Sequence, residues 1–423
     1  MQNFYAKEKN FLVVEPGSWR SKAGTADYLE QYPCHIHSRI GVKYVPVHTE
    51  SAPSEDPSMD SPSHVSDTVK AVYQPLDSES DPPIDQSVPT DPEALRAVRP
   101  IQGGLVADWG AFEALLDDIL IRQLAVNRAK NESLVVLSLP VRWNKFEHER
   151  LAQIMFESLN CPGILVVEQP LMALYGANLS TGLVIDIGHE TTDITPVIDN
   201  VVVRHASITL DLGGSDIDQY LLSLLREDPQ VAQDYGHAPD LKLARAIKES
   251  KFCDIRPATI AKVDTETERK PFTFDGKTIN LGLNRHLCAN VLFDPLLVGK
   301  SIPNLCEGIQ LAISAINDLD KRFALWESLL ITGGSSNLIG LKDRLESEIA
   351  PYISASETAN EYQPKEIKFL RLSEYFVNFK DQPHDAAFIG ASLVAKLMFP
   401  ESKNYVSKVD YNELGPACVH LKA

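Results

Sequence analysis

The sequence predicts an α/β protein built twice on the same plan. Buried strands alternate with amphipathic helices along the chain, which is the pattern of α/β domains. Two units each open with an apolar strand that runs into a glycine-bearing turn, and this repetition indicates an internal duplication. At 423 residues the chain is longer than a single hydrophobic core usually grows. We therefore expect two domains.

The first half of the chain supplies the first unit. Apolar residues at helical spacing predict its helices, and continuous apolar runs predict buried parallel strands. In chain order we expect strands at 10–14 and 40–47, a helix at 109–124, a strand at 134–139, a helix at 147–159 and a strand at 163–167. From residue 48 to residue 92 the composition changes to Ser, Pro, Asp and Glu, with few aromatic residues. Such a stretch buries too little apolar surface to offset its ordering entropy, so we expect a disordered insertion or a long loop.

The second half repeats the plan. An Asp-Gly pair at 275–276 between alternating apolar residues is a strong hairpin signal. The expected elements are a strand at 183–187, a hairpin at 194–203, a helix at 216–225, the hairpin at 272–279, a strand at 329–332, and helices at 338–349 and 386–398.

Composition excludes several classes of protein. The formal charge of −18 argues against direct nucleic-acid binding, because phosphate contacts need clustered Lys and Arg, and it favours a basic protein partner. No apolar run approaches the roughly 18 residues of a membrane span, and the N-terminus does not resemble a secretory signal, so we expect a soluble chain that is not exported. The six cysteines form no C-x-x-C pair and are expected to be reduced core thiols of the cytosol or nucleus.

Glycine-rich turns at strand ends are the main chemical signal. Without a Cβ, backbone amides can converge closely on an anion such as phosphate. Three such turns occur, at Gly17-Ser18, at 186–192 and at Gly333-Gly334-Ser335. A single glycine after a strand is usually only a turn, but three in this order predict a phosphate-binding cleft.

At these turns the chain resembles actin and the actin-related proteins over nearly its whole length. The resemblance implies the actin-like fold, in which duplicated ribonuclease-H-like domains enclose a nucleotide cleft, as in Hsp70 and the sugar kinases. It divides the chain into a small domain at 1–169 plus 386–423 and a large domain at 170–385, with an outer subdomain at about 213–300. The matching segments are 13–18, 22–24, 100–109, 153–157, 186–188, 210–216, 247–249, 333–334, 389–392 and 407–416.

The resemblance also assigns a nucleotide site that is partly retained. Lys22 matches the lysine on the phosphates, Gln169 the glutamine that positions water, and Asp186 the acid of the second loop. Each has a structural alternative, because a lysine can lie at the surface and a glycine can serve its turn alone. The retained positions are Gly17, Ser18, Lys22, Gln169, Asp186, Gly188, Gly214, Arg245, Lys248, Glu249, Gly333, Gly334 and Ser335.

Other positions depart from the family. Trp19 replaces a small residue at the first phosphate turn, Pro16 removes a backbone donor, and Glu190 is expected to bring negative charge among phosphate oxygens. The departures are Glu15, Pro16, Trp19, His189, Glu190, Asp193, which stands where the family has its catalytic histidine, and His384. We therefore expect no catalytic residues, no ATP hydrolysis and no cofactor, with weak binding of ATP and Mg²⁺ as the alternative.

No metal site is expected. His35 and His37 flank Ile36, but a metal would need further ligands nearby, and the sequence shows none beside them. Structural or surface histidines are the preferred interpretation.

Within the family, the resemblance is closest to the nuclear fungal actin-related proteins, of the actin-related protein 9 type, in SWI/SNF and RSC chromatin remodellers. It implies a nuclear, non-catalytic subunit that binds the helicase-SANT-associated helix of the remodeller ATPase beside a second actin-related protein, with room for a small accessory subunit. The matching base groove, at 139–140, 175–176 and 405–419, would accept that helix. The residues that carry this resemblance are 191–194, 321–326, 375–376 and 388–391.

Two alternatives stay open at this point. Lys22, Gln169 and Asp186 are compatible with an actin-like, ATP-binding cytoskeletal protein of slow ATPase activity. A sugar or acetate kinase shares the same core, but the matches at 153–157 and at the C-terminus favour the actins.

Overall fold

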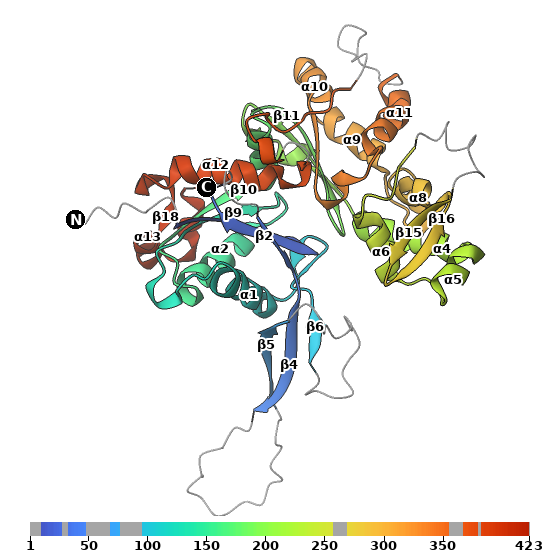
Figure 1. The fold of residues 1–423 in the computed structure, drawn as a ribbon. Helices are drawn as coiled ribbons and strands as arrows, with labels where there is room; N and C mark the ends of the chain where they lie inside the picture. The colour runs from blue at the N-terminus through green and yellow to red at the C-terminus, as the bar shows by residue number, and fades with distance from the viewer. Residues whose placement is uncertain are drawn as a thin grey trace, which may run out of the picture.

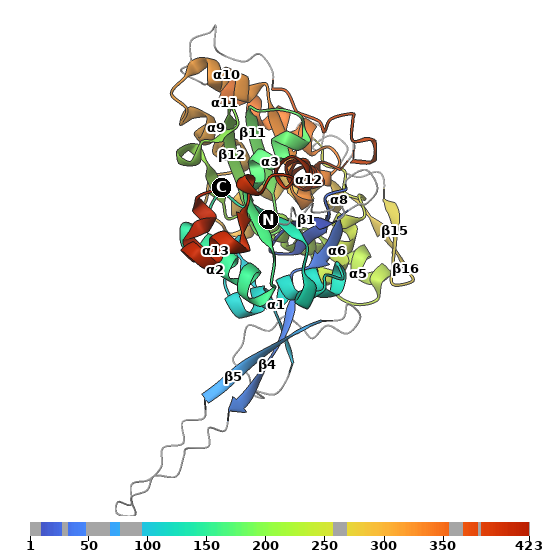
Figure 2. The same ribbon diagram turned by 90° about the vertical axis from the view of Figure 1, so that its left-hand side faces the viewer.

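The computed structural model describes residues 10–27, 33–47, 68–76, 95–256, 269–354, 367–379 and 382–422. Two sheet-bearing halves lie side by side, and strands β4 and β5 extend away from the first of them (Figures 1 and 2). Within these residues, no helix combines the length and the apolar character needed to cross a bilayer.

The described elements follow the predicted alternation of strands and helices. The strands are β1 (Phe11–Glu15), β2 (Arg20–Thr25), β3 (Cys34–His37), β4 (Ile40–Val47), β5 (Thr68–Pro75), β6 (Arg96–Val98), β7 (Ile101–Gln102), β8 (Leu105–Val106), β9 (Leu134–Leu139), β10 (Gly163–Glu168), β11 (Gly182–Ile187), β12 (Thr192–Ile198), β13 (Val201–Val202), β14 (Ile208–Leu210), β15 (Lys270–Phe274), β16 (Lys277–Leu281), β17 (Leu329–Thr332) and β18 (Val406–Ser407). The main helices are α1 (Trp109–Asp117), α2 (Lys145–Gln153), α3 (Gln169–Gly176), α4 (Gly214–Glu227), α5 (Pro229–Tyr235), α6 (Leu241–Glu249), α8 (Asn284–Leu287), α9 (Leu305–Ser314), α10 (Leu319–Trp326), α11 (Leu341–Ser354), α12 (Ala386–Met398) and α13 (Lys408–Leu414). Short turns of helix complete them, among them η2 (Asp118–Gln123), η4 (Ile154–Ser158), η7 (Pro295–Val298), η8 (Gly334–Asn337), η11 (Pro383–Asp385) and η13 (Pro416–His420).

The two halves are built around sheets of the same plan. The first sheet has the order β18-β10-β9-β1-β2-β3, with β1, β9 and β10 parallel and β2 antiparallel to β1. In the second sheet, β11 is parallel to β17 and antiparallel to β12. The predicted strands at 134–139 and 329–332 are confirmed to the residue as β9 and β17. The repetition of a parallel pair with an antiparallel neighbour agrees with the predicted duplication.

The predicted insertion contains a strand that composition did not indicate. Strand β5 pairs antiparallel with β4 along its whole length, from Ile40 opposite Pro75 to Val47 opposite Thr68. The prediction of disorder is therefore wrong for 68–75, where β-branched and aromatic residues favour a strand although the surroundings are polar. Tyr73 anchors β5 to the body, since its hydroxyl lies 3.1 Å from the Asp108 carboxylate at the start of α1. The rest of the predicted insertion, 48–67 and 77–92, lies outside the described residues.

The predicted helices are confirmed, and two of them end differently from ordinary α-helices. The helix predicted at 109–124 begins at α1, capped by Asp108, and closes as the π-helix η2. The helix predicted at 147–159 begins at α2, with a capping box between Asn144 and Glu147, and closes as η4. The Asp275-Gly276 turn has positive φ at both residues, as a tight hairpin between β15 and β16 requires.

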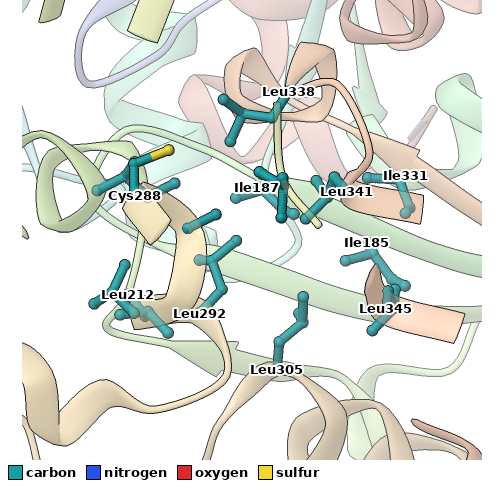
Figure 3. Packing of buried hydrophobic residues seen from close by; sticks show 14 of the residues in the cluster. Ile185, Ile187, Leu212, Cys288, Leu292, Leu305, Ile331, Leu338, Leu341 and Leu345 are labelled. Atoms are coloured by element: carbon teal, nitrogen blue, oxygen red, sulfur yellow. The ribbon is translucent and has the colours of Figure 1, made fainter. Parts of the chain in front are cut away.

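Alternate residues of each strand face different hydrophobic clusters. Along β1, Leu12 and Val14 join the cluster beneath α1 and α2, whereas Phe11 and Val13 join a central cluster with α3 and α12. The second sheet contributes Val184 of β11 to that same central cluster. Its opposite face packs on α9 and α11, where Ile185, Ile187, Leu305, Ile331, Leu341 and Leu345 interdigitate (Figure 3). The central cluster thus joins the two sheets.

Five of the six cysteines are buried free thiols, as predicted, but the prediction of a core thiol is wrong for Cys34, which is exposed on β3. The hydrophobic clusters hold all five: Cys161 and Cys418 lie in the cluster beneath α1 and α2, and Cys253, Cys288 and Cys306 lie in that of the second half.

Two glycines allow α3 and α12 to cross in direct backbone contact. A Cβ at Gly390 would overlap the carbonyl oxygen of Met172, and a Cβ at Gly176 would overlap that of Ala386. Figure 2 shows the two helices side by side near the middle of the molecule. Because α12 packs on β1 and β9 while α3 also packs on β11 and β12, this crossing couples the halves.

We expect Gly390→Ala to destabilise the protein by about 3 kcal/mol or more, because the overlapping atom belongs to rigid backbone. Gly282→Ala is the matched control, since its Cβ would meet only the side chain of Arg269 at 3.7 Å. Denaturant unfolding of both variants measures the difference. Equal midpoints for the two variants would contradict the role given to the helix crossing.

Candidate functional site

A cleft of about 510 Å³ lies between the two halves. Its walls are the β1–β2 turn, the loop after β11, the starts of α3 and α4, the end of α6, and the loop after β17. The structure brings the predicted site residues together here, with Arg245 and Glu190 outside the lining described for the cavity. The predicted residues that line it are Glu15, Pro16, Gly17, Ser18, Trp19, Lys22, Gln169, Asp186, Gly188, His189, Asp193, Gly214, Lys248, Glu249, Gly333, Gly334, Ser335 and His384.

Two glycines of the cleft, Gly17 and Gly333, are required by the local backbone. Gly333 has φ of +85°, and a Cβ there would overlap Asp186 and the backbone of Ile187. A Cβ at Gly17 would crowd the carbonyl oxygen of Arg20. Retention of Gly17 and Gly333 therefore follows from packing, whether or not a phosphate binds.

Lys22 is held by the protein's own oxygens. Its ammonium nitrogen lies 2.8 Å from Oε1 of Glu15 and also donates to the backbone oxygen of His384. Burial alone would lower the pKa of Lys22, but the charges of Glu15 and Asp385 raise it above its ordinary value, so the ammonium is firmly protonated. Gln169 donates to the same Glu15 oxygen at 3.0 Å. The longer Glu15 side chain thus binds both groups that the family directs at phosphate and water.

Burial raises the pKa of two acids in the cleft. Burial, followed by the neighbouring charge of Glu15, raises the pKa of Asp186 to about 7, and Lys22 opposes the shift only in part. Burial also raises the pKa of Asp193, whose carboxylate accepts a hydrogen bond of 2.5 Å from Thr209. A second cavity of about 240 Å³ meets the cleft at Gln169, Asp186 and Asp193.

Trp19 fills the phosphate turn and crosses the cleft. Its ring packs on His189, with centroids 4.7 Å apart, and the guanidinium of Arg245 lies 4.0 Å from its centroid. Arg99 approaches the same ring at 4.8 Å. Burial, and after it the positive charges of Arg99, Lys248 and Arg245, lowers the pKa of His189 to about 3. The imidazole is therefore neutral at physiological pH and packs on the indole without adding charge.

Glu190 does not point at the phosphate region, and the sequence-based prediction of its position is wrong. Its carboxylate accepts a hydrogen bond of 2.6 Å from the backbone amide of Gly103 and lies 3.3 Å from Arg99. The amide in the β7–β8 turn and the guanidinium satisfy the charge that sequence reasoning had left unpaired. Three sets of contacts join the two halves. Trp19 packs on His189 and Arg245, Glu190 binds Gly103 and Arg99, and Arg20 lies 3.1 Å from Glu249. We call these contacts the latch.

Lys248 and Arg245 are bound to the second half by a buried acid. Asp218 lies 2.6 Å from Lys248 and 3.3 Å from Arg245, and Lys248 also donates to the backbone oxygen of Gly214. The predicted nucleotide-edge residues are therefore in place but engaged with protein atoms.

Sequence reasoning missed several participants in the site: Arg20 and Asp218, and also Arg99 and Asp385. Arg99 gave no signal, because it stands alone between two short strands. Asp385 lies beside His384 in the chain, yet its proximity to His35 on β3 depends on the fold. No local pattern relates two residues that lie 350 positions apart.

The sheet plan and the glycine-lined cleft are those of an actin-type protein. The sequence profile described as Actin matches residues 6–423, and the chain therefore belongs to the actin family.

Its relatives include actin-related proteins. It is similar to actin-related protein 2 of Saccharomyces cerevisiae, at 28% identity over 329 residues, which is 76% of this chain and 80% of the relative. It is also similar to actin-related protein 7 of Arabidopsis thaliana, at 28% over 334 residues (76% and 84%), and to actin-related protein 2 of Schizosaccharomyces pombe, at 30% over 328 residues (76% and 80%).

Asp186→Asn is expected to flatten part of the pH dependence of stability. The native pKa of Asp186, about 7, lies above its ordinary 3.8, so the native state holds a proton that the unfolded chain releases between these values. The contribution of Asp186 to stability therefore falls as the pH rises from about 4 to 7. Above pH 7 the full free-energy cost of burying the ionised carboxylate remains. We expect the variant to gain about 1–2 kcal/mol over the parent at pH 8 and little at pH 4, measured by urea unfolding. An equal difference at both pH values would contradict the shift.

Trp19→Ala is expected to loosen the latch. The loss of its ring contacts should cost about 1–3 kcal/mol and speed hydrogen exchange of the amides at 188–191 on the opposite wall. Arg20→Ala is the control, because its ion pair with Glu249 is exposed and should be worth less than about 1 kcal/mol. If both variants leave exchange at 188–191 unchanged, Trp19 does not join the two walls.

Proposed function

We propose that this actin-family chain is a non-catalytic, nuclear subunit of a chromatin remodeller of the SWI/SNF and RSC type. In this proposal it binds the helicase-SANT-associated helix of the ATPase subunit beside a second actin-related protein, and it regulates how the motor couples ATP hydrolysis to movement on DNA. A small accessory subunit is compatible with the same arrangement.

The latch is the observation that carries the non-catalytic part of the proposal. Catalysis of phosphoryl transfer needs free amides, a free lysine and a positioned water at the phosphates. Here the Trp19 ring fills the first turn, Lys22 binds Glu15, and Asp193 stands at the position of the family's catalytic histidine. A closed cleft without nucleotide would still hold the two halves at a fixed angle, as a scaffold for a partner requires.

The base of the molecule supports the partner part of the proposal. Exposed apolar side chains lie on elements that pack together there, with Phe146 on α2, Val409 and Leu414 on α13, and Leu421 after η13. The acidic side chains of Glu149 and Glu413 lie on the same helices. An amphipathic helix with a basic face matches this surface, and the formal charge of −18 favours such a partner.

The second candidate is an actin-like ATP-binding protein of the cytoskeleton with slow ATPase activity. It is favoured by Gln169 and Asp186, which line the cleft where the family positions water and metal. Weak binding of ATP with Mg²⁺ is compatible with the remodeller proposal as well.

Binding of the remodeller helix tests the proposal. We expect the full chain to bind a peptide of the helicase-SANT-associated segment, and Leu414→Asp to weaken that binding at least about tenfold, because a charge would replace an apolar contact. Leu296→Asp is the matched control, since Leu296 is also exposed, at 69% against 57% for Leu414, but lies on η7 in the other half. Fluorescence anisotropy measures both variants.

Nucleotide content tests the alternative. Freshly purified protein that releases stoichiometric ADP on denaturation, together with measurable phosphate production, would favour the cytoskeletal ATPase. Failure of the peptide to bind the parent chain would overturn the remodeller assignment.

A further inference from the structure

Three potential metal ligands converge in the cleft beside Lys22. They are Nε2 of His35 on β3, a ring nitrogen of His384 and the carboxylate of Asp385, and their ligand atoms all lie within 4.8 Å of one another. The Nε2 atom of His35 lies 3.7 Å from one Asp385 oxygen, and Nε2 of His384 lies 3.5 Å from the other. Both imidazoles also line the cleft, so the cluster is accessible from solvent.

The buried carboxylate of Asp385, which has no hydrogen-bond partner among the described residues, is the observation that points to a ligand. Its side chain is 0% exposed, and neither carboxylate oxygen has a hydrogen-bond partner among the described residues. Burying an ionised carboxylate without partners is costly, and native proteins nearly always satisfy such a group with hydrogen bonds, an ion pair or a metal. The ammonium of Lys22 is 3.9 Å away, too far for a hydrogen bond, and it is already bound to Glu15.

The surrounding charges permit a divalent cation. The charged groups that act on the cluster from the surrounding elements are Lys22, Arg20, Lys251 and Glu15. Lys22 is paired with Glu15 and Arg20 with Glu249, so these two cations are each engaged by an acid of their own. The Asp385 carboxylate is then left to face a cation held by the two imidazoles.

Asn337 orients the His384 ring. Its amide nitrogen lies 2.9 Å from Nδ1 of His384 and donates to it, on the ring edge opposite Nε2. A metal on Nε2 would require this amide to turn so that its oxygen accepts a hydrogen bond from Nδ1, the outer contact that metal-binding histidines usually make.

We propose that His35, His384 and Asp385 form a binding site for a divalent transition metal, with Zn²⁺ as its natural occupant. Two imidazoles and one carboxylate are a ligand set that suits zinc and disfavours Mg²⁺ and Ca²⁺, which select oxygen ligands. Small rotations of these side chains would bring the three atoms to the usual 2.0–2.2 Å from the metal, and water from the cleft would complete a tetrahedron.

The bound metal acts as a staple between the two ends of the chain. His35 lies on β3 at the edge of the first sheet, and His384 and Asp385 immediately precede α12. The metal fixes the start of α12, the helix that crosses α3, to the sheet that α12 covers. The site lies at the nucleotide cleft but needs no nucleotide.

Zinc titration of the full chain, stripped beforehand with a chelator, tests the site. In competition with a chromophoric chelator at neutral pH, we expect one equivalent of Zn²⁺ to bind with a Kd of about 1 µM or tighter. His384→Ala and Asp385→Asn should each weaken this binding at least about tenfold, because each removes one of three protein ligands. Mg²⁺ in excess should not displace the zinc.

Matched variants separate this site from adventitious binding. His37→Ala and Cys34→Ser change residues of the same strand that lie outside the cluster, and both should keep the parent affinity. His35→Ala is a second ligand variant that should fold, since the His35 side chain is 34% exposed. Circular dichroism confirms folding of each variant before titration.

Cobalt spectroscopy supplies an independent readout. The Co²⁺ complex should show the intense visible bands of a tetrahedral site with nitrogen and oxygen ligands and no thiolate charge-transfer band. The proposal is overturned if the parent binds no zinc in this range, if the folded ligand variants bind as the parent does, or if a thiolate band appears and is lost in Cys34→Ser.

Discussion

The crossing of α3 and α12 is the constraint on which the rest of the molecule depends. Gly176 and Gly390 bring the two helices into backbone contact, and no larger side chain fits at either position. Because α12 covers the first sheet and α3 reaches the second, the crossing sets where the two sheets lie relative to each other. The cleft follows from it, since the turns that face one another across the gap belong to these two sheets.

Within that cleft, side chains from the two halves contact one another directly. In an actin-type cleft, phosphates bind turns from both halves and so hold them together. Here an indole packed on a neutral imidazole and two guanidinium groups spans the same gap, and Glu190 is tied to Gly103 and Arg99. A clamp of this kind is compatible with a protein whose working surface lies beneath the cleft.

The proposed metal staple would reinforce the same architecture at the start of α12. His35 and Asp385 belong to segments that frame α12, so a bound cation would fix that helix where the latch does not reach. The latch and the staple involve different residues, and their variants can therefore be tested separately. Both leave the apolar surface on α2 and α13 free for a partner.

The sequence by itself determined the elements and the turns of this protein. Strands such as β9 and β17 are local apolar runs, and Gly333 is required by the backbone of its own turn, so period and composition were enough to find them. Composition did not predict β5, because pairing with β4 stabilises this strand within a polar stretch of the sequence. Only the tertiary structure decided which side chains meet: that Glu190 turns to Gly103, and that His35 reaches Asp385. Such contacts join distant segments whose approach is fixed by helix crossing and sheet packing, and no local pattern encodes that approach.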